Sequence, residues 1–226
     1  MLKLNIRRFK KYIVFNVLFT FCNFGFAGSF EDFFKAAELD NESAVVALAL
    51  RGFDLNSQNE KGDSGLHVGL REGSLKVVSF LLTQRAVRVE LYNRQGESPL
   101  MIAAIKGHLD MARQLIRRGA EVNKPGWTPL HYASSRAESD SADMVRLLLE
   151  HHAYIDAESP NRSTPLMLAA MYGHRDLVSL LLEEGADPSL RNDQGLTAVD
   201  FARRAERDDL AELIAQRLRQ RRAPGR

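Results

Sequence analysis

The sequence predicts an all-α solenoid, a stack of about six helix-turn-helix repeats joined by β-hairpin loops. A tetrad that begins with Ser or Thr recurs along the chain, and its third positions are separated by 34, 30, 36 and 33 residues. A Leu-rich stretch follows most copies, and Gly-Ala or a variant of it closes them. Similar spacing near 33 residues indicates stacked units, since one such unit cannot bury its apolar face alone.

Each tetrad has the residues that begin a helix. The copies start at Ser64, Ser98, Thr128, Thr164 and Thr197. A Ser or Thr oxygen can accept an orphan backbone N–H at a helix start, and Pro in the next position has the φ angle of the first helical turn. Small residues such as Ala103-Ala104 and Ala169-Ala170 keep this first helix thin. Glycines such as Gly173 are then expected to end it.

The second helix of each unit supplies most of the predicted core. It is the Leu-rich stretch, and Gly119 or Gly185 ends it before the chain turns into a loop that we call a finger. These features together resemble the ankyrin repeat, whose signature is T-P-L-H-x-A-A-x-x-G-H followed by L-L-L-x-x-G-A. The resemblance covers residues 30–218. It implies that finger tips and the exposed ends of the first helices bind another protein.

The two ends of the predicted solenoid differ. Repeat 1 lacks the tetrad, and Phe30, Phe33 and Phe34 are expected to close its interface with repeat 2. Repeat 6 has a polar outer side, as a terminal repeat requires. We expect residues 219–226 to form a disordered, Arg-rich tail. Such a tail could contact nucleic acid or anionic lipid, although a solvated terminus is the interpretation that we prefer.

Three departures from regularity stand out. Arg85 and His152 replace the terminal glycine, so each is predicted to adopt a left-handed conformation, which costs about 1 kcal/mol. The finger Asn123–Thr128 is shorter than its counterparts, and the turn Ser134–Asp143 is longer. Because these changes lie in loops and offset each other, they preserve the stack. They predict a notch at repeat 4.

Residues 1–27 are typical of a secretory signal peptide. A basic run ends at Lys11, an apolar stretch follows, and Gly25-x-Ala27 fits cleavage before Gly28. The alternative is an uncleaved anchor, although about 15 apolar residues are fewer than the roughly 20 that a span needs. Cleavage would remove Cys22, the sole cysteine, and would leave 26 basic and 29 acidic groups. We therefore predict an exported protein, periplasmic or secreted.

Catalytic and metal chemistry find little support in the sequence. The tetrapeptide Gly62-Asp63-Ser64-Gly65 is similar to the nucleophile loop of trypsin-like serine proteases, but it falls in register with the repeats. His67 and His131 belong to tetrads, and in ankyrin-like repeats such imidazoles bond across to adjacent loops. No Cys or paired carboxylate is spaced to join His151 and His152 into a metal site. We expect no catalytic residue, cofactor, metal or nucleic-acid partner.

The predicted function is non-catalytic binding or protection of a partner protein in an exported compartment. The alternatives are an inhibitor or immunity partner of a toxin, and a membrane-tethered scaffold with an uncleaved leader; membrane contact is expected only in the latter, and no oligomer is required. Trp127 could instead pack only on the neighbouring finger. The predicted partner-binding residues are Arg94, Gln95, Ile105, Lys106, Lys124, Trp127, Arg136, Met171 and Tyr172.

Overall fold

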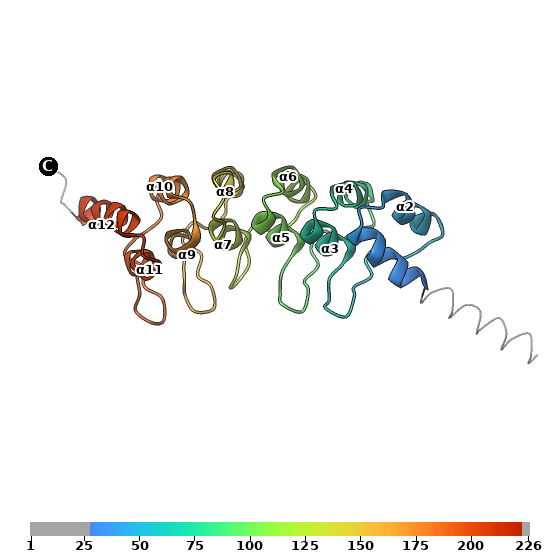
Figure 1. The fold of residues 1–226 in the computed structure, drawn as a ribbon, viewed down its shortest axis with the longest axis horizontal. Helices are drawn as coiled ribbons and strands as arrows, with labels where there is room; N and C mark the ends of the chain where they lie inside the picture. Colours follow the sequence, from blue (N-terminus) through green and yellow to red (C-terminus); the bar gives the residue numbers. More distant parts are fainter. Residues whose placement is uncertain (1–27, 223–226) are drawn as a thin grey trace, which may run out of the picture.

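The computed structural model describes residues 28–222, which form two layers of helices (Figure 1). The predicted leader and residues 223–226 lie outside this range. The first layer contains a helix over residues 28–38, α3 (Gly65–Glu72), α5 (Pro99–Lys106), α7 (Pro129–Ser134), α9 (Pro165–Tyr172) and α11 (Ala198–Arg204). The second layer contains α2 (Glu42–Leu50), α4 (Leu75–Thr83), α6 (Leu109–Arg117), α8 (Ser141–Glu150), α10 (Arg175–Glu183) and α12 (Asp208–Arg222).

Each helix packs on its equivalents in the adjacent repeats, as a solenoid requires. The tetrad leucines Leu66, Leu100, Leu130 and Leu166 are buried between repeats, as are the small alanines that follow them. None of the helices within residues 28–222 combines the length and the apolar character needed to cross a membrane. The predicted all-α solenoid is therefore confirmed.

The helix starts follow the predicted chemistry. The hydroxyls of Ser98, Thr128 and Thr164 each accept the backbone N–H three residues later. Gly73 and Gly107 end α3 and α5 with φ angles of 76° and 73°. Gly173 ends α9 differently, since its φ is −73°. Close approach requires glycine there, because an added Cβ would lie 2.9 Å from the carbonyl oxygen of Ala169.

The aromatic residues of repeat 1 close the first interface. Phe33 is fully buried, and its ring centroid lies 5.1 Å from that of Phe34 and 4.9 Å from that of Phe53. Gly65 stands where three of the other four tetrads have Pro, and a Cβ there would lie 2.5 Å from the Phe33 ring. The glycine of the protease-like tetrapeptide therefore makes room for an aromatic ring.

The left-handed prediction is confirmed for His152, with φ of 64°, and is wrong for Arg85. At the end of α4, a side chain from the next repeat instead supplies hydrogen-bond donors to the backbone carbonyls. Gln84 is extended, and Arg118 reaches back from the next repeat. Its guanidinium donates to the carbonyl oxygens of Leu82 at 3.0 Å and Val87 at 2.7 Å.

The fingers are loops rather than regular β-hairpins. Within residues 28–222 the only β pairing is one isolated antiparallel bridge between Gln58 and Ser64. Adjacent fingers are joined by single backbone bonds, such as the one from Arg94 N–H to the carbonyl of Lys61. Because backbone bonds between fingers are sparse, side chains must fix their relative positions.

The expected disordered tail is corrected at its start, because α12 continues to Arg222. Arg219 pairs with Glu212 at 2.5 Å on the same helix. Arg221 donates to the carbonyls of Gly185 and Ala186 after α10. These contacts extend the helix and tie its basic end to repeat 5.

Candidate functional site

An open hollow of ≈ 330 Å³ lies over repeat 4, on the side of the first helices and fingers. We call it the repeat-4 hollow, and its lining residues are Ile105, Trp127, His131, Tyr132, Ser135, Leu168 and Tyr172. Two features of the sequence create it. Ser135 is small where the equivalent positions hold Arg71, Ile105 and Met171, and the finger between α6 and α7 is shortened, as Figure 1 shows.

Three of the predicted partner-binding residues come together in this hollow. Ile105 lies in the last turn of α5 on one side, Tyr172 ends α9 on the other, and Trp127 lies at the base of the short finger. Sequence reasoning missed Tyr132 and Leu168. Both directly follow their tetrads, at the position where Ile102 of repeat 3 is buried, so the pattern does not mark them as contact residues.

Trp127 has a structural contact and a free surface. Its ring meets the edge of His131 at a centroid distance of 5.4 Å and an interplanar angle of 80°. The side chain nevertheless remains 37% exposed. Trp127 therefore packs on the first helix of its own repeat and also keeps an exposed surface, and mutation distinguishes a structural role from a binding role.

The short finger is tied to the finger before it. Lys124 donates from Nζ to the carbonyl of Gly96 at 3.0 Å and lies 4.9 Å from the Tyr92 ring centroid. Arg94 and Gln95 are exposed at the preceding finger tip. Lys106 is exposed at the end of α5, next to Ile105. None of these four predicted residues lines the hollow.

Arg136 corrects the sequence-based expectation of an exposed contact. Its side chain is only 8% exposed, and it pairs with Glu138 at 3.1 Å and Asp140 at 2.8 Å inside the long turn. The guanidinium lies directly over Gly107, where an added Cβ would be 1.4 Å from Nη1. Arg136 therefore supports the turn from within. Met171 is half-buried and lies outside the lining.

A chain of polar side chains fixes the Tyr132 wall of the hollow. Tyr132 donates its hydroxyl to Glu97 at 3.1 Å, and Glu97 also contacts Arg71 and Asn93. Burial and the nearby Glu97 raise the pKa of Tyr132, so its hydroxyl remains a donor. Burial alone would raise the pKa of Asp63, but hydrogen bonds from Arg71 and Asn93 outweigh it and hold that pKa below its usual value.

Ser64 and His67 superficially resemble a catalytic pair, since Ser64 Oγ lies 2.9 Å from His67 Nδ1. Both side chains are buried, and Nε2 of His67 bonds the carbonyl of Glu97 at 3.0 Å. Thr128 and His131 repeat the arrangement, with Nε2 of His131 on the Ser163 carbonyl. Because the same arrangement recurs in two repeats, we interpret each imidazole as a structural bridge to the next finger, as predicted.

Burial lowers the pKa of both His67 and His131, so both bridges use neutral imidazole. Met101 and Met167 occupy the same tetrad position in repeats 3 and 5. Across residues 28–222, no three His, Cys, Asp or Glu side chains are grouped as a metal site would require.

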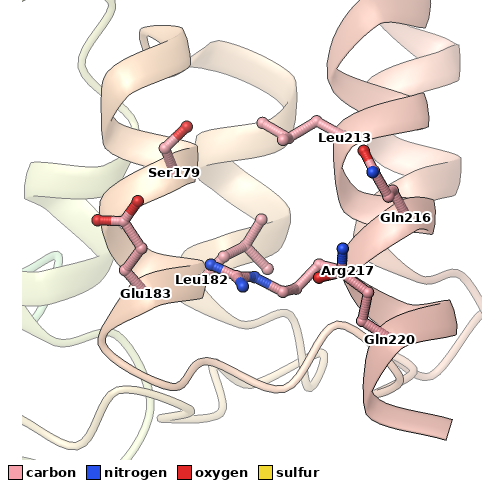
Figure 2. Close-up of a pocket in the computed structure, with 7 residues that line it drawn as sticks. All are labelled: Ser179, Leu182, Glu183, Leu213, Gln216, Arg217 and Gln220. Carbon is pink, nitrogen blue, oxygen red and sulfur yellow. The ribbon is translucent and has the colours of Figure 1, made fainter. Parts of the chain in front are cut away.

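A second hollow, of ≈ 190 Å³, lies between α10 and α12 (Figure 2). Glu183 and Arg217 lie on its two sides, and Ser179, Gln216 and Gln220 make it mostly polar. It is distant in sequence from the predicted contact residues, and its walls lack the aromatic groups that anchor protein partners. The repeat-4 hollow is therefore the stronger candidate.

Comparison with known proteins gives consistent results. The family model described as ankyrin repeats (3 copies) matches residues 33–125, 87–159 and 137–220. The chain is 35% identical over 156 residues to the nuclear factor NF-kappa-B p105 subunit of Mus musculus, covering 66% of this chain and 16% of that protein. It is 30% identical over 166 residues to the B-cell lymphoma 3 protein homolog of Mus musculus, covering 70% and 36%. The chain thus spans well under half of these relatives.

A solved structure covers a similar length. It is the Bd0816 predatory endopeptidase from Bdellovibrio bacteriovorus in complex with immunity protein Bd3460. The similar chain in it has a TM-score of 0.71 and 29% sequence identity, with 82% of this chain and 97% of that chain covered.

Proposed function

Because the chain belongs to the ankyrin repeat family, whose repeats bind protein partners, we propose that it is a non-catalytic module that binds and restrains an exported partner enzyme through the repeat-4 hollow. The hollow carries this proposal. It presents two exposed aromatic rings, Trp127 and Tyr172, across a fixed gap, and aromatic anchors in pockets dominate the energy of many protein interfaces.

The nature of the partner is inferred from the similar solved complex, which contains an endopeptidase and an immunity protein. We propose that this chain likewise acts as an immunity-type protein and that its partner is a peptidase. A rigid solenoid suits this role, since a preformed surface loses little conformational entropy on binding.

Export is part of the proposal and rests on the leader. A basic segment, an apolar run and Gly25-x-Ala27 support cleavage before Gly28 in a secretory pathway. Intact-mass measurement on protein from the exported fraction tests it. A species in the membrane fraction that retains residues 1–27 would contradict cleavage and favour a tethered scaffold.

Capture of the partner tests the binding proposal. The tagged protein is isolated from its host with bound proteins, and a recovered peptidase is then purified for activity and affinity measurements. Trp127→Ala and Tyr172→Ala should each weaken binding roughly tenfold or more, because each removes an anchor worth about 2 kcal/mol. Glu60→Ala and Asp193→Ala, on distant finger tips, are matched controls that should change affinity little.

The melting temperature of the Trp127→Ala variant distinguishes a binding role of Trp127 from a purely structural one. If Trp127 were purely structural, Trp127→Ala would lower the melting temperature while folded protein kept its affinity. Unchanged affinity in both aromatic variants would remove the repeat-4 hollow as the binding site. A partner whose peptidase activity is unaffected by saturating amounts of this protein would contradict the immunity-type role.

A further inference from the structure

Backbone hydrogen bonds join neighbouring fingers at one recurring position. The N–H of Arg94 donates to the carbonyl of Lys61 at 3.0 Å, and the N–H of Asp193 donates to the carbonyl of Asn161 at 3.1 Å. Each donor is the fourth residue before its tetrad, and each acceptor is the third residue before the preceding tetrad. The bond therefore belongs to the repeat pattern, and we call these two places the donor position and the acceptor position.

The short finger lacks this bond to the finger before it. The finger Asn123–Thr128 has six residues, whereas the equivalent finger Asn56–Ser64 has nine. Lys124 holds the donor position, but it reaches the preceding finger through its side chain, which donates to the carbonyl of Gly96. Within residues 28–222, no N–H donates to the carbonyl of Gln95, which holds the acceptor position.

The finger after the short one also lacks the bond. Pro160 holds its donor position, and proline has no backbone N–H. The Pro160 ring instead lies beside Gly126, where an added Cβ would be 3.6 Å from its Cγ. The row of bonds between fingers is therefore interrupted on both sides of the short finger, and the interruption coincides with the missing finger tip.

The free carbonyl of Gln95 is on a finger that borders the repeat-4 hollow. Two residues further along that finger, Glu97 accepts a hydrogen bond from the hydroxyl of Tyr132, which lines the hollow. The place of the missing finger tip is therefore close to an apolar surface. A segment that fills this place can pair its main chain with the finger and put a side chain into the hollow.

We propose that a loop of the partner protein takes the place of the missing finger tip. A backbone N–H of this loop donates to the carbonyl of Gln95 and continues the row of bonds between fingers, while one apolar side chain of the loop enters the repeat-4 hollow. This inference rests on the proposed function, because it names how the partner binds the same site. Main-chain bonds of this kind add affinity, and the pocket for the side chain gives specificity.

Two uncharged peptides test the proposed main-chain bond. Acetyl-Asn-Ala-Gln-Gly-Phe-Ser-amide follows the pattern of the full-length fingers, in which Asn, Gly and Ser or Thr recur at these positions, and its Phe supplies the apolar side chain. The control peptide has N-methylalanine in place of alanine, which removes the backbone N–H at the donor position. Each peptide is titrated into isotope-labelled protein, and binding is followed by NMR.

The unmethylated peptide should bind roughly fivefold more tightly, because only this peptide has the N–H that pairs with Gln95. It should shift the amide nitrogen of Gly96, which shares a peptide bond with the Gln95 carbonyl, and the indole of Trp127. Gly195 is an internal control. It follows Gln194, whose carbonyl also lacks a donor in the described part of the chain but belongs to the last finger, away from the hollow, so Gly195 should shift less.

A variant with a full-length finger sharpens the test. Residues 123–126 are replaced by the sequence of residues 56–62, which keeps Trp127 and adds three residues. The new tip should fill the place proposed for the loop, so peptide affinity should fall by about fivefold or more while the helical circular dichroism signal is kept. The matched control puts the same sequence into residues 189–195, where the length does not change, and should leave peptide affinity unchanged.

Four results would overturn the inference: equal affinities of the two peptides, equal shifts at Gly96 and Gly195, undiminished binding to the variant with the full-length finger, or no shift with either peptide. None of these affects the capture experiment, in which Trp127→Ala and Tyr172→Ala decide the proposed function. Conversely, capture that survives both aromatic substitutions would refute the function at this site, even if the unmethylated peptide bound there.

Discussion

Gly107 and Gly73 offer a matched pair for measuring what Arg136 contributes to stability. Both glycines end a first helix, with φ angles of 73° and 76°. An added Cβ at Gly73 would meet nothing within 4 Å, whereas at Gly107 it would lie 1.4 Å from Arg136 Nη1. Alanine therefore introduces the same backbone strain at both positions and displaces a buried guanidinium at only one.

The two losses can be estimated separately. A non-glycine residue in the left-handed region costs roughly 1–2 kcal/mol, so Gly73→Ala should lower the free energy of unfolding by that amount. Displacing Arg136 breaks its bonds to Glu138 and Asp140 and disturbs a buried side chain. Hydrogen bonds of charged groups contribute about 1.5–3 kcal/mol. Gly107→Ala should therefore lower the free energy of unfolding by about 2.5–5 kcal/mol in total.

Urea unfolding followed by circular dichroism measures both variants, and a double-mutant cycle isolates the contact. In an Arg136→Ala background, Gly107→Ala should cost only the backbone strain seen at Gly73. Equal losses for the two single variants would refute the reasoning. So would a Gly107→Ala loss that is unchanged when Arg136 is absent.

Three further predictions concern the imidazole bridges, the left-handed His152 and the contacts of Arg118. Replacing both His67 and His131 by Met should flatten the pH dependence of the free energy of unfolding. Burial lowers the pKa of both imidazoles, so their contribution to wild-type stability is fully present above about pH 6.5 and is lost as the pH falls below that value. The loss is at most about 1.4 kcal/mol per pH unit for each imidazole. His152→Gly should stabilise by roughly 0.5–1 kcal/mol, and Arg85→Gly should not, because only His152 is left-handed. Arg118→Ala should destabilise by about 1–3 kcal/mol, because it leaves the carbonyls of Leu82 and Val87 without the guanidinium donor. Urea midpoints, at two pH values for the first, measure all three.

One control and two contradicting outcomes complete these predictions. The exposed neighbour Arg117→Ala should shift the unfolding free energy by less than about 0.5 kcal/mol. An unchanged pH slope in the His-to-Met variant would show that the two bridges are not the source of acid sensitivity. Stabilisation by Arg85→Gly would contradict the assigned backbone conformation.

Local chemistry was enough to predict the helices and the stack. Ser98-Pro99 and Thr164-Pro165 identify helix starts, and Gly107 identifies a helix end, because each acts on backbone groups a few residues away. The bridging role of His67 and His131 was implied by the resemblance to the ankyrin repeat, because both residues occupy the histidine position of its tetrad. The family resemblance and the residues agree on these elements.

The errors concern contacts between repeats. Arg118 acts on carbonyls more than 30 positions earlier, and Arg136 is buried by Gly107 of the preceding repeat. Neither relation has a local signature, so Arg85 was assigned a left-handed conformation and Arg136 an exposed one. The position of the hollow was partly predictable from loop lengths. Its full lining was not, because Tyr132 and Leu168 occupy the position at which Ile102 of repeat 3 is buried.

The caps that cross repeat boundaries bear on how freely this chain could be rearranged. Arg118 serves the end of α4, which lacks a left-handed glycine, and Arg136 requires Gly107 beneath it. Arg207 likewise reaches from repeat 6 to the carbonyl of Gly173. Repeats 3, 4 and 6 are thus each complementary to the particular repeat that precedes them. Shuffling or duplicating repeats would preserve every tetrad. It would nevertheless place these arginines beside repeats that lack the matching carbonyls or the matching glycine.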